Sequence, residues 1–93
     1  MSPNPRRRVA LMGATGVAGQ QFLVSLERHP WFELTTLAAS SRSAGKAYTD
    51  AITDAGGQRQ WFCEEPLPAA FARMPVVDSD GFDPSSVDLV FSA

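Results

Sequence analysis

The segment Gly13–Gly19, which reads GATGVAG, holds the residue types best suited to bind a charged ligand. It directly follows the apolar run Val9–Met12 and directly precedes a helical pattern. Glycines in this arrangement let the chain turn tightly, let the backbone approach a phosphate, and let a helix sit close to a sheet. The helix N-terminus adds free N–H groups and a partial positive charge. The segment therefore predicts a pyrophosphate site between a strand and a helix.

A second polar segment, Ser40–Lys46, follows the strand predicted at Glu33–Ala39 and contains no acidic residue. At this place an NAD site usually carries Asp or Glu, which binds the ribose 2′-hydroxyl. Here serines surround Arg42, and hydroxyls with a guanidinium suit a 2′-phosphate that a carboxylate would repel. The segment favours NADP, and the alternative is a polar loop without a ligand. A P-loop phosphotransferase is excluded, because no Lys-Ser/Thr pair closes the glycine loop.

The elements that must position these two segments form a strand–helix–strand unit. Apolar residues recur at helical spacing between Val17 and Arg28, and Gly19 lies on the same buried stripe. Pro30 ends the helix, because proline lacks an N–H and restrains the residue before it. The strands Val9–Met12 and Glu33–Ala39 flank this helix, so we expect a β-α-β unit with a right-handed crossover.

The second half of the chain predicts two further strands. Short apolar runs indicate strands at Pro75–Asp78 and Asp88–Ser92, with one helical turn at Asp83–Val87 between them. Residues 47–74 show no clear periodicity. Within them, Gln58–Cys63 reads as a further possible strand after a glycine turn.

Three remaining side chains could take part in chemistry but fit structural roles better. Cys63 has no base or cation beside it in the sequence, and Glu64 and Glu65 would raise its pKa, so we predict a non-catalytic thiol. His29, the single histidine, follows a helix C-terminus, where an imidazole complements the helix dipole. We expect Trp61 to anchor packing rather than to stack on a base.

Length and charge limit the classes of function. The 93 residues allow one small domain, and a net charge of −2 argues against a nucleic-acid binder. Residues 1–46 are net basic and residues 47–93 net acidic, so the basic half carries the glycine segment. A single cysteine and the lack of a membrane-length apolar stretch indicate a cytoplasmic protein. We read residues 1–8 as a disordered basic tail, because they contain two prolines and three arginines and show no periodicity. The apolar run that follows is too short for a signal peptide, because Gly13 interrupts it.

Three stretches of the chain carry a family resemblance: GATGVAGQQF, HPWFELTTLAASSRSAGKAY and VDLVFSA. Together they resemble the N-terminal part of aspartate-semialdehyde dehydrogenase, in the branch best known from archaea and fungi, over about Arg8 to Ala93. The resemblance implies an NADPH-dependent oxidoreductase that converts aspartyl phosphate to aspartate semialdehyde and phosphate, for lysine, threonine and methionine biosynthesis. It also implies a small-molecule substrate, a homo-oligomer as the full-length protein, and no nucleic-acid or membrane partner.

The resemblance assigns cofactor-binding roles to residues of both polar segments. The residues implied to face the pyrophosphate are Gly13, Thr15, Gly16 and Val17. The residues implied to hold the 2′-phosphate are Ser40, Arg42 and Ser43, with Lys46 a weaker candidate. Where the last strand ends, the residues implied to touch the cofactor are Ser92 and Ala93.

The family's nucleophilic cysteine and basic histidine lie downstream in a second domain, and neither Cys63 nor His29 matches their motifs. We therefore expect residues 9–93 to form an incomplete NADP-binding Rossmann domain without the catalytic and dimerisation domain. Its fold class is α/β, a partial doubly wound parallel sheet with a β-α-β unit plus two further strands, as a fragment of a larger two-domain protein. By itself the chain would be inactive. The alternative is a non-catalytic nucleotide-binding protein, or a truncated remnant that binds nothing.

Overall fold

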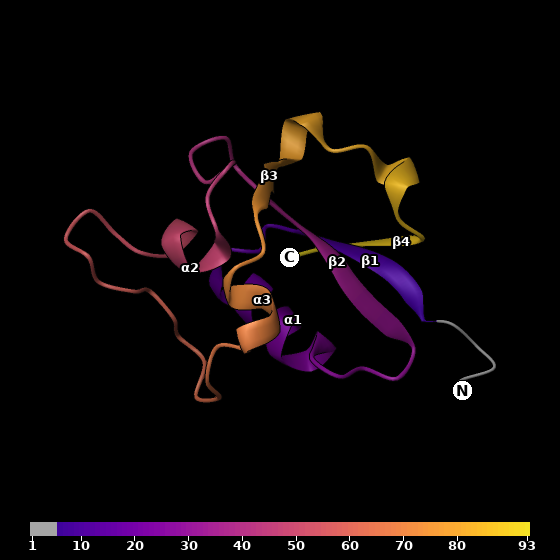
Figure 1. Ribbon diagram of the computed structural model, residues 1–93, viewed down its shortest axis with the longest axis horizontal. Coiled ribbons are helices and arrows are strands. Elements are labelled where there is room, and N and C mark those ends of the chain that lie inside the picture. Colours follow the sequence, from indigo (N-terminus) through magenta and orange to yellow (C-terminus); the bar gives the residue numbers. More distant parts are fainter. Residues whose placement is uncertain (1–5) are drawn as a thin grey trace.

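The computed structural model describes residues 6–93, so Met1–Pro5 of the predicted basic tail lie outside the described residues. One parallel four-stranded sheet forms the centre of the molecule, in the order β3-β2-β1-β4 (Figure 1). Its strands are β1 (Arg7–Met12), β2 (Phe32–Ala39), β3 (Val76–Asp78) and β4 (Leu89–Ser92). The helices are α1 (Val17–Leu26), α2 (Tyr48–Ala51) and α3 (Ala69–Ala72), and the 3-10 turns are η1 (Ser79–Gly81) and η2 (Pro84–Ser86).

This architecture confirms the predicted α/β class, the β-α-β unit and the two further parallel strands. β1 lies in the middle, and its Val9, Ala10 and Leu11 are completely buried, which explains why an unbroken apolar run forms this strand. Met12 at the end of β1 pairs with Ala38 of β2 on one side and with Ser92 of β4 on the other. The carboxyl ends of three strands therefore meet at one edge of the sheet.

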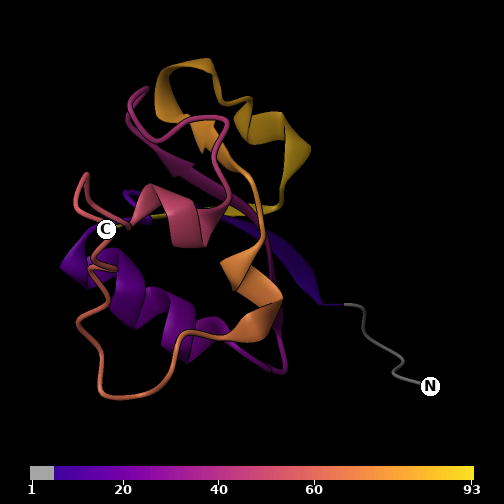
Figure 2. The same cartoon turned by 60° about the vertical axis from the view of Figure 1, so that its left-hand side comes forward.

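The three helices lie on one side of the sheet (Figure 2). Each of them contributes side chains to one apolar core against the sheet. Leu23 and Leu26 of α1 belong to this core, as the helical spacing of the apolar residues predicts. Tyr48 of α2 and Phe71 of α3 join the same cluster. The described helices are all too short to cross a membrane.

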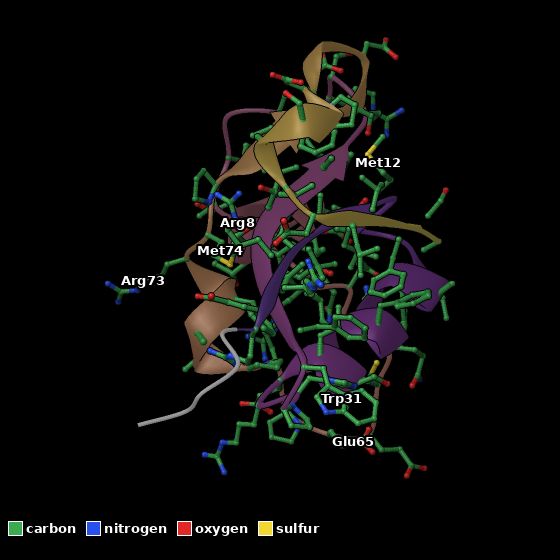
Figure 3. The ribbon with its side chains drawn as sticks, turned by 90° about the vertical axis from the view of Figure 1, so that its right-hand side faces the viewer. Arg8, Met12, Trp31, Glu65, Arg73 and Met74 are labelled. Carbon is green, nitrogen blue, oxygen red and sulfur yellow. The ribbon has the colours of Figure 1, made fainter. Side chains whose placement is uncertain are left out.

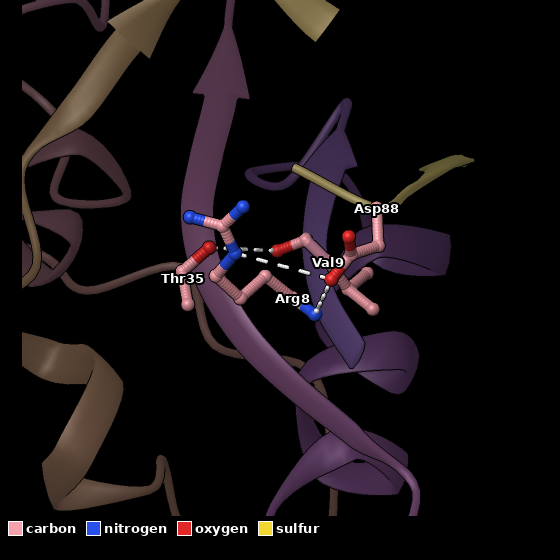
Figure 4. A network of polar contacts seen from close by, with 4 residues as sticks. All are labelled: Arg8, Val9, Thr35 and Asp88. Carbon is pink, nitrogen blue, oxygen red and sulfur yellow. Dashed lines mark hydrogen bonds and ion pairs between the residues drawn. The ribbon is translucent and has the colours of Figure 1, made fainter. Parts of the chain in front are cut away.

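The first strand starts earlier than the sequence indicates. Arg7 and Arg8 pair with Phe32 and Glu33, so this part of the predicted tail is strand. Asp88 contacts this added part of β1 twice (Figure 4). The Arg8 amide donates to Asp88 Oδ2 over 2.7 Å, and Arg8 Nε lies 3.9 Å from the same oxygen. Both groups of this ion pair are partly exposed to solvent, so the strand pairing contributes more than the charges to the stability of this end of β1.

Helix α1 ends at Leu26, two residues before the predicted end at Arg28. The Glu27 amide donates to the carbonyl of Leu23, and Arg28 then adopts a left-handed φ of 60°. The helix thus closes with a left-handed residue just before Pro30, a position that usually favours glycine.

The strand predicted at Gln58–Cys63 is wrong. This stretch is irregular, with a single isolated bridge between Thr53 and Arg59. No described strand lies beside it to complete a ladder, and its backbone bonds locally: the Gln60 amide donates to the carbonyl of Ile52. Trp61 packs against the core as predicted, and its indole N–H donates to the carbonyl of Glu65 over 2.7 Å.

Candidate functional site

The turn between β1 and α1, which we call the phosphate turn, comprises Gly13–Gly16. Gly13 has a φ of +73°, and a Cβ there would lie 3.0 Å from the carbonyl oxygen of Ala93. This residue therefore needs to be glycine for both its conformation and its close neighbour. The amides of Gly13 and Ala14 both donate to the carbonyl of Ala38, which fixes the turn to the end of β2.

The start of α1 presents backbone N–H groups at the end of this turn. Gly16 is the N-cap, with φ −77° and ψ 173°, and no side chain caps the helix there. The first helical turn contains no acidic residue, and its amides have no acceptors within the helix. A Cβ at Gly16 would meet only the Gly13 oxygen, at 3.8 Å, so the surroundings of this glycine are open. This arrangement suits an anion.

Gly19 lets α1 lie directly against the turn. It is buried, and a Cβ there would clash with the carbonyl oxygen of Gly13 and come within 2.8 Å of two backbone atoms of Ala14. The predicted close packing of helix and turn is thus confirmed.

The loop Ser40–Lys46, which we call the serine–arginine loop, leaves the end of β2. The Ser43 amide donates to the carbonyl of Ser40 over 2.9 Å. Val76 of β3 holds the far end of the loop, accepting from Gly45 N and donating to the Lys46 carbonyl, each over 2.8 Å. Arg42 is exposed and forms no ion pair with any residue in the described part of the chain, so its guanidinium is available to a ligand.

A cavity of about 320 Å³ lies between the phosphate turn and the serine–arginine loop. Both predicted halves of the site contribute to it, through Thr15, Ser40, Arg42 and Ser43. The other predicted residues do not line it: Gly13, Gly16 and Val17 lie in the turn and at the helix start, and Lys46 ends the loop. Ser92 ends β4 beside Met12, at the same edge of the sheet.

The remaining wall of the cavity comes from residues that the sequence did not single out. They are Ala51, Ile52, Thr53, Asp54 and Gln60. A carboxylate would oppose a phosphate here, but Asp54 is engaged by its own turn. Its Oδ1 accepts from the amides of Gly56 and Gln58, and its Oδ2 accepts from Gln60 Nε2, each over 2.9 Å. In the sequence, the pair Gly56–Gly57 indicated a turn, but no pattern indicated that this turn would lie beside the cavity.

The structure places Cys63 and His29 away from the lining of this cavity. Burial raises the pKa of the half-buried Cys63 thiol, and the nearby Glu65 carboxylate raises it further, in the predicted direction. His29 Nδ1 accepts from the Trp31 amide over 3.1 Å, and its ring stacks on Phe32 with centroids 4.8 Å apart. Residues 6–93 contain no cluster of histidine, cysteine and acidic side chains that could hold a metal ion.

Comparison with known proteins places this geometry in a family. The family model of the semialdehyde dehydrogenase NAD-binding domain matches residues 8–93. Aspartate-semialdehyde dehydrogenase of Methanothermobacter thermautotrophicus is 46% identical over 85 residues, which cover 91% of this chain and 22% of that protein. The enzyme of the same name from Cryptococcus neoformans is 41% identical over 96 residues, covering 99% of this chain and 24% of that protein.

A solved structure supports the same relationship. The aspartate-semialdehyde dehydrogenase of Candida albicans, crystallised with NADP, matches with a TM-score of 0.80 and 37% sequence identity, over 96% of this chain and 23% of that one. The chain thus spans between a fifth and a quarter of the length of these relatives. It belongs to the semialdehyde dehydrogenase family and corresponds to that family's NAD-binding domain.

Proposed function

We propose that this chain is the NADP-binding portion of an aspartate-semialdehyde dehydrogenase. The observation that carries the proposal is the shared cavity, in which Thr15 of the phosphate turn faces the same space as Ser40, Arg42 and Ser43. One dinucleotide can therefore bind both segments at once. No acidic residue stands between Ser40 and Lys46 to repel a 2′-phosphate, and the Candida albicans relative was crystallised with NADP.

Each part of the site has a distinct role in this proposal. Gly13, Thr15, Gly16 and Val17 face the pyrophosphate, where the open start of α1 offers amides and the positive end of its dipole. Arg42 and its flanking serines bind the 2′-phosphate through charge-assisted hydrogen bonds. Ser92 contacts the cofactor at the end of β4.

The full-length enzyme would reduce aspartyl phosphate with NADPH and release aspartate semialdehyde and phosphate, as a step of lysine, threonine and methionine biosynthesis. It would do so as a cytoplasmic homo-oligomer. The contribution of residues 6–93 is to bind and orient the cofactor. The family's reaction needs a thiolate with a nearby base, and the half-buried Cys63, with its raised pKa, lacks both properties. The 93-residue chain alone should therefore show no dehydrogenase turnover.

A chimera tests the proposal. Residues 8–93 would replace the matched N-terminal segment of the Candida albicans enzyme, and NADPH oxidation with aspartyl phosphate would be followed by absorbance. We expect activity with NADPH and a marked preference for it over NADH. A folded chimera that binds NADPH without turnover would favour the alternative, a non-catalytic nucleotide-binding protein. A folded chimera that binds neither cofactor would favour the remnant.

A further inference from the structure

Two buried side chains reach the phosphate turn from the side of the core. The hydroxyl of Tyr48 in α2 donates to the carbonyl of Ala14 over 2.6 Å. The side-chain amide of Gln20 in α1 donates to the carbonyl of Thr15 over 3.3 Å. Both side chains are completely buried, and neither was among the predicted site residues.

Successive carbonyls in this turn have their hydrogen-bond partners inside the protein. A carbonyl oxygen that faced the ligand would repel a phosphate, whereas a backbone N–H attracts it. Tyr48 and Gln20 hold the carbonyl oxygens of Ala14 and Thr15 toward the core. These bonds favour the peptide orientation that an anion site requires, in which the carbonyl oxygens point away from the ligand. We propose that Tyr48 and Gln20 are positioning residues that preorganise the phosphate turn for the pyrophosphate of NADP. This inference rests on the proposed function.

Gln20 has a second connection, to the far wall of the cavity. Its Nε2 also donates to the carbonyl of Gln60, and its Oε1 accepts from the amide of Phe62, each over 2.8 Å. One side chain thus fixes the phosphate turn relative to the segment that contributes Gln60 to the cavity. Every polar atom of Gln20 is used, which is the condition for burying an amide without a large penalty.

Packing alone does not require the hydroxyl of Tyr48. A phenylalanine would fill nearly the same space and would avoid the desolvation of a hydroxyl. What the hydroxyl adds is the bond to Ala14 across the interface between α2 and the turn. Tyr48→Phe therefore removes the positioning contact while it keeps the ring in the core.

The test compares two ligands on the chimera in which residues 8–93 replace the matched segment of the Candida albicans enzyme. NADPH contains both the pyrophosphate and the 2′-phosphate, whereas adenosine 2′-monophosphate lacks the pyrophosphate. We expect Tyr48→Phe to weaken NADPH binding about tenfold, equivalent to about 1.4 kcal/mol, and to leave the affinity for adenosine 2′-monophosphate nearly unchanged. Gln20→Leu should also lose more affinity for NADPH than for the mononucleotide. Isothermal titration calorimetry gives both affinities.

The matched control is Thr35→Val, which removes a hydroxyl-to-carbonyl bond of 3.4 Å to Val9, away from the turn (Figure 4). It should change neither affinity. A variant that loses affinity for both ligands in equal proportion would overturn the positioning role of that residue. General destabilisation of the fold would weaken the binding of both ligands alike, whereas a positioning role affects NADPH alone. If Tyr48→Phe does not fold, the ratio measured for Gln20→Leu decides. Failure of the folded, unchanged chimera to bind NADPH would refute the proposed function and this inference with it.

Discussion

At the residue scale, the choice between NADP and NAD depends on Arg42. Its side chain is exposed at the cavity, and the surrounding loop offers hydroxyls and no carboxylate. Arg42→Ala should weaken NADPH binding by about 1.5–3 kcal/mol, the value of a hydrogen bond to a charged group, and leave NADH binding nearly unchanged. Fluorescence titration of the two reduced cofactors measures both. Arg73→Ala is the control, because Arg73 is an exposed arginine that does not line the cavity. Equal weakening of both cofactors would show that Arg42 does not recognise the 2′-phosphate.

The raised pKa of Tyr48 leads to a prediction about stability at high pH. Burial raises it far above its ordinary value of 10.0, with a smaller contribution from Cys63. The folded protein therefore keeps a proton that the unfolded chain releases, so the free energy of unfolding should fall as pH rises above about 10. Tyr48 is the single tyrosine, so tyrosinate absorbance reports on it alone. We expect that absorbance to rise together with loss of the circular dichroism signal. Ionisation near the ordinary value in the folded chain would contradict the observed burial.

The sequence predicted part of the cavity, for a definite physical reason. Thr15 and Arg42 follow neighbouring parallel strands, whose carboxyl ends must meet at one edge. Thr53, Asp54 and Gln60 could not be found in this way. Gln60, for example, is positioned by a partly buried hydrogen bond from Gln20, which also binds the Phe62 amide, and no periodic pattern connects these segments.

At the element scale, the packing of α1 against the phosphate turn depends on Gly19. Alanine has the higher helix propensity, by about 1 kcal/mol, so an isolated helix would gain from Gly19→Ala. In this protein the added Cβ would clash with the Gly13 oxygen, so the helix must move away from the turn. We expect a net loss of about 1–3 kcal/mol in the free energy of unfolding, as for other overpacked cores.

Urea denaturation followed by circular dichroism measures this loss. Gly81→Ala is the matched control, since a Cβ at Gly81 would meet nothing within 4 Å and its φ is not positive. It should leave the stability nearly unchanged. A Gly19→Ala variant as stable as the original chain would mean that helix and turn do not pack as closely as the structure places them.

Long elements with a regular pattern could be predicted from the sequence, and very short helices could not. α1 has ten residues with a buried stripe, and the strands have short apolar runs or, in β2, residues that favour strands, so their types were evident. α2 and α3 have four residues each, about one helical turn, which is too short for a period of 3.6 residues to show. The Asp83–Val87 turn was recognisable because Pro84 suits a first helical position, and it is observed as η2.

At the scale of the whole molecule, the described surface exposes several large apolar side chains. Leu89 and Val90 of β4 are 41% and 42% exposed, and β4 pairs only with β1 among the described strands. Trp31, 70% exposed, lies at the opposite end of the sheet from Met12 (Figure 3). An unpaired apolar edge strand promotes association.

We therefore expect the 93-residue chain to self-associate as its concentration rises. Val90→Lys should reduce this association, because a lysine on an edge strand opposes pairing with another chain. Sedimentation velocity over a range of concentrations measures the effect. Trp31→Lys, at the other end of the molecule, distinguishes association through β4 from general apolar contact. If both substitutions reduce association equally, or neither does, β4 is not the contact.

If the proposed function holds, the phosphate turn and the serine–arginine loop bind one molecule of NADP together. Nuclear magnetic resonance of the isotopically labelled chain during NADPH titration tests it most directly. We expect the backbone amides of Thr15, Gly16 and Val17 to shift together with those of Ser40, Arg42 and Ser43, along one binding curve. Adenosine 2′-monophosphate should shift only the second set. If NADPH leaves either set unchanged, or if the two sets follow different binding curves, the claim of a single shared site is wrong.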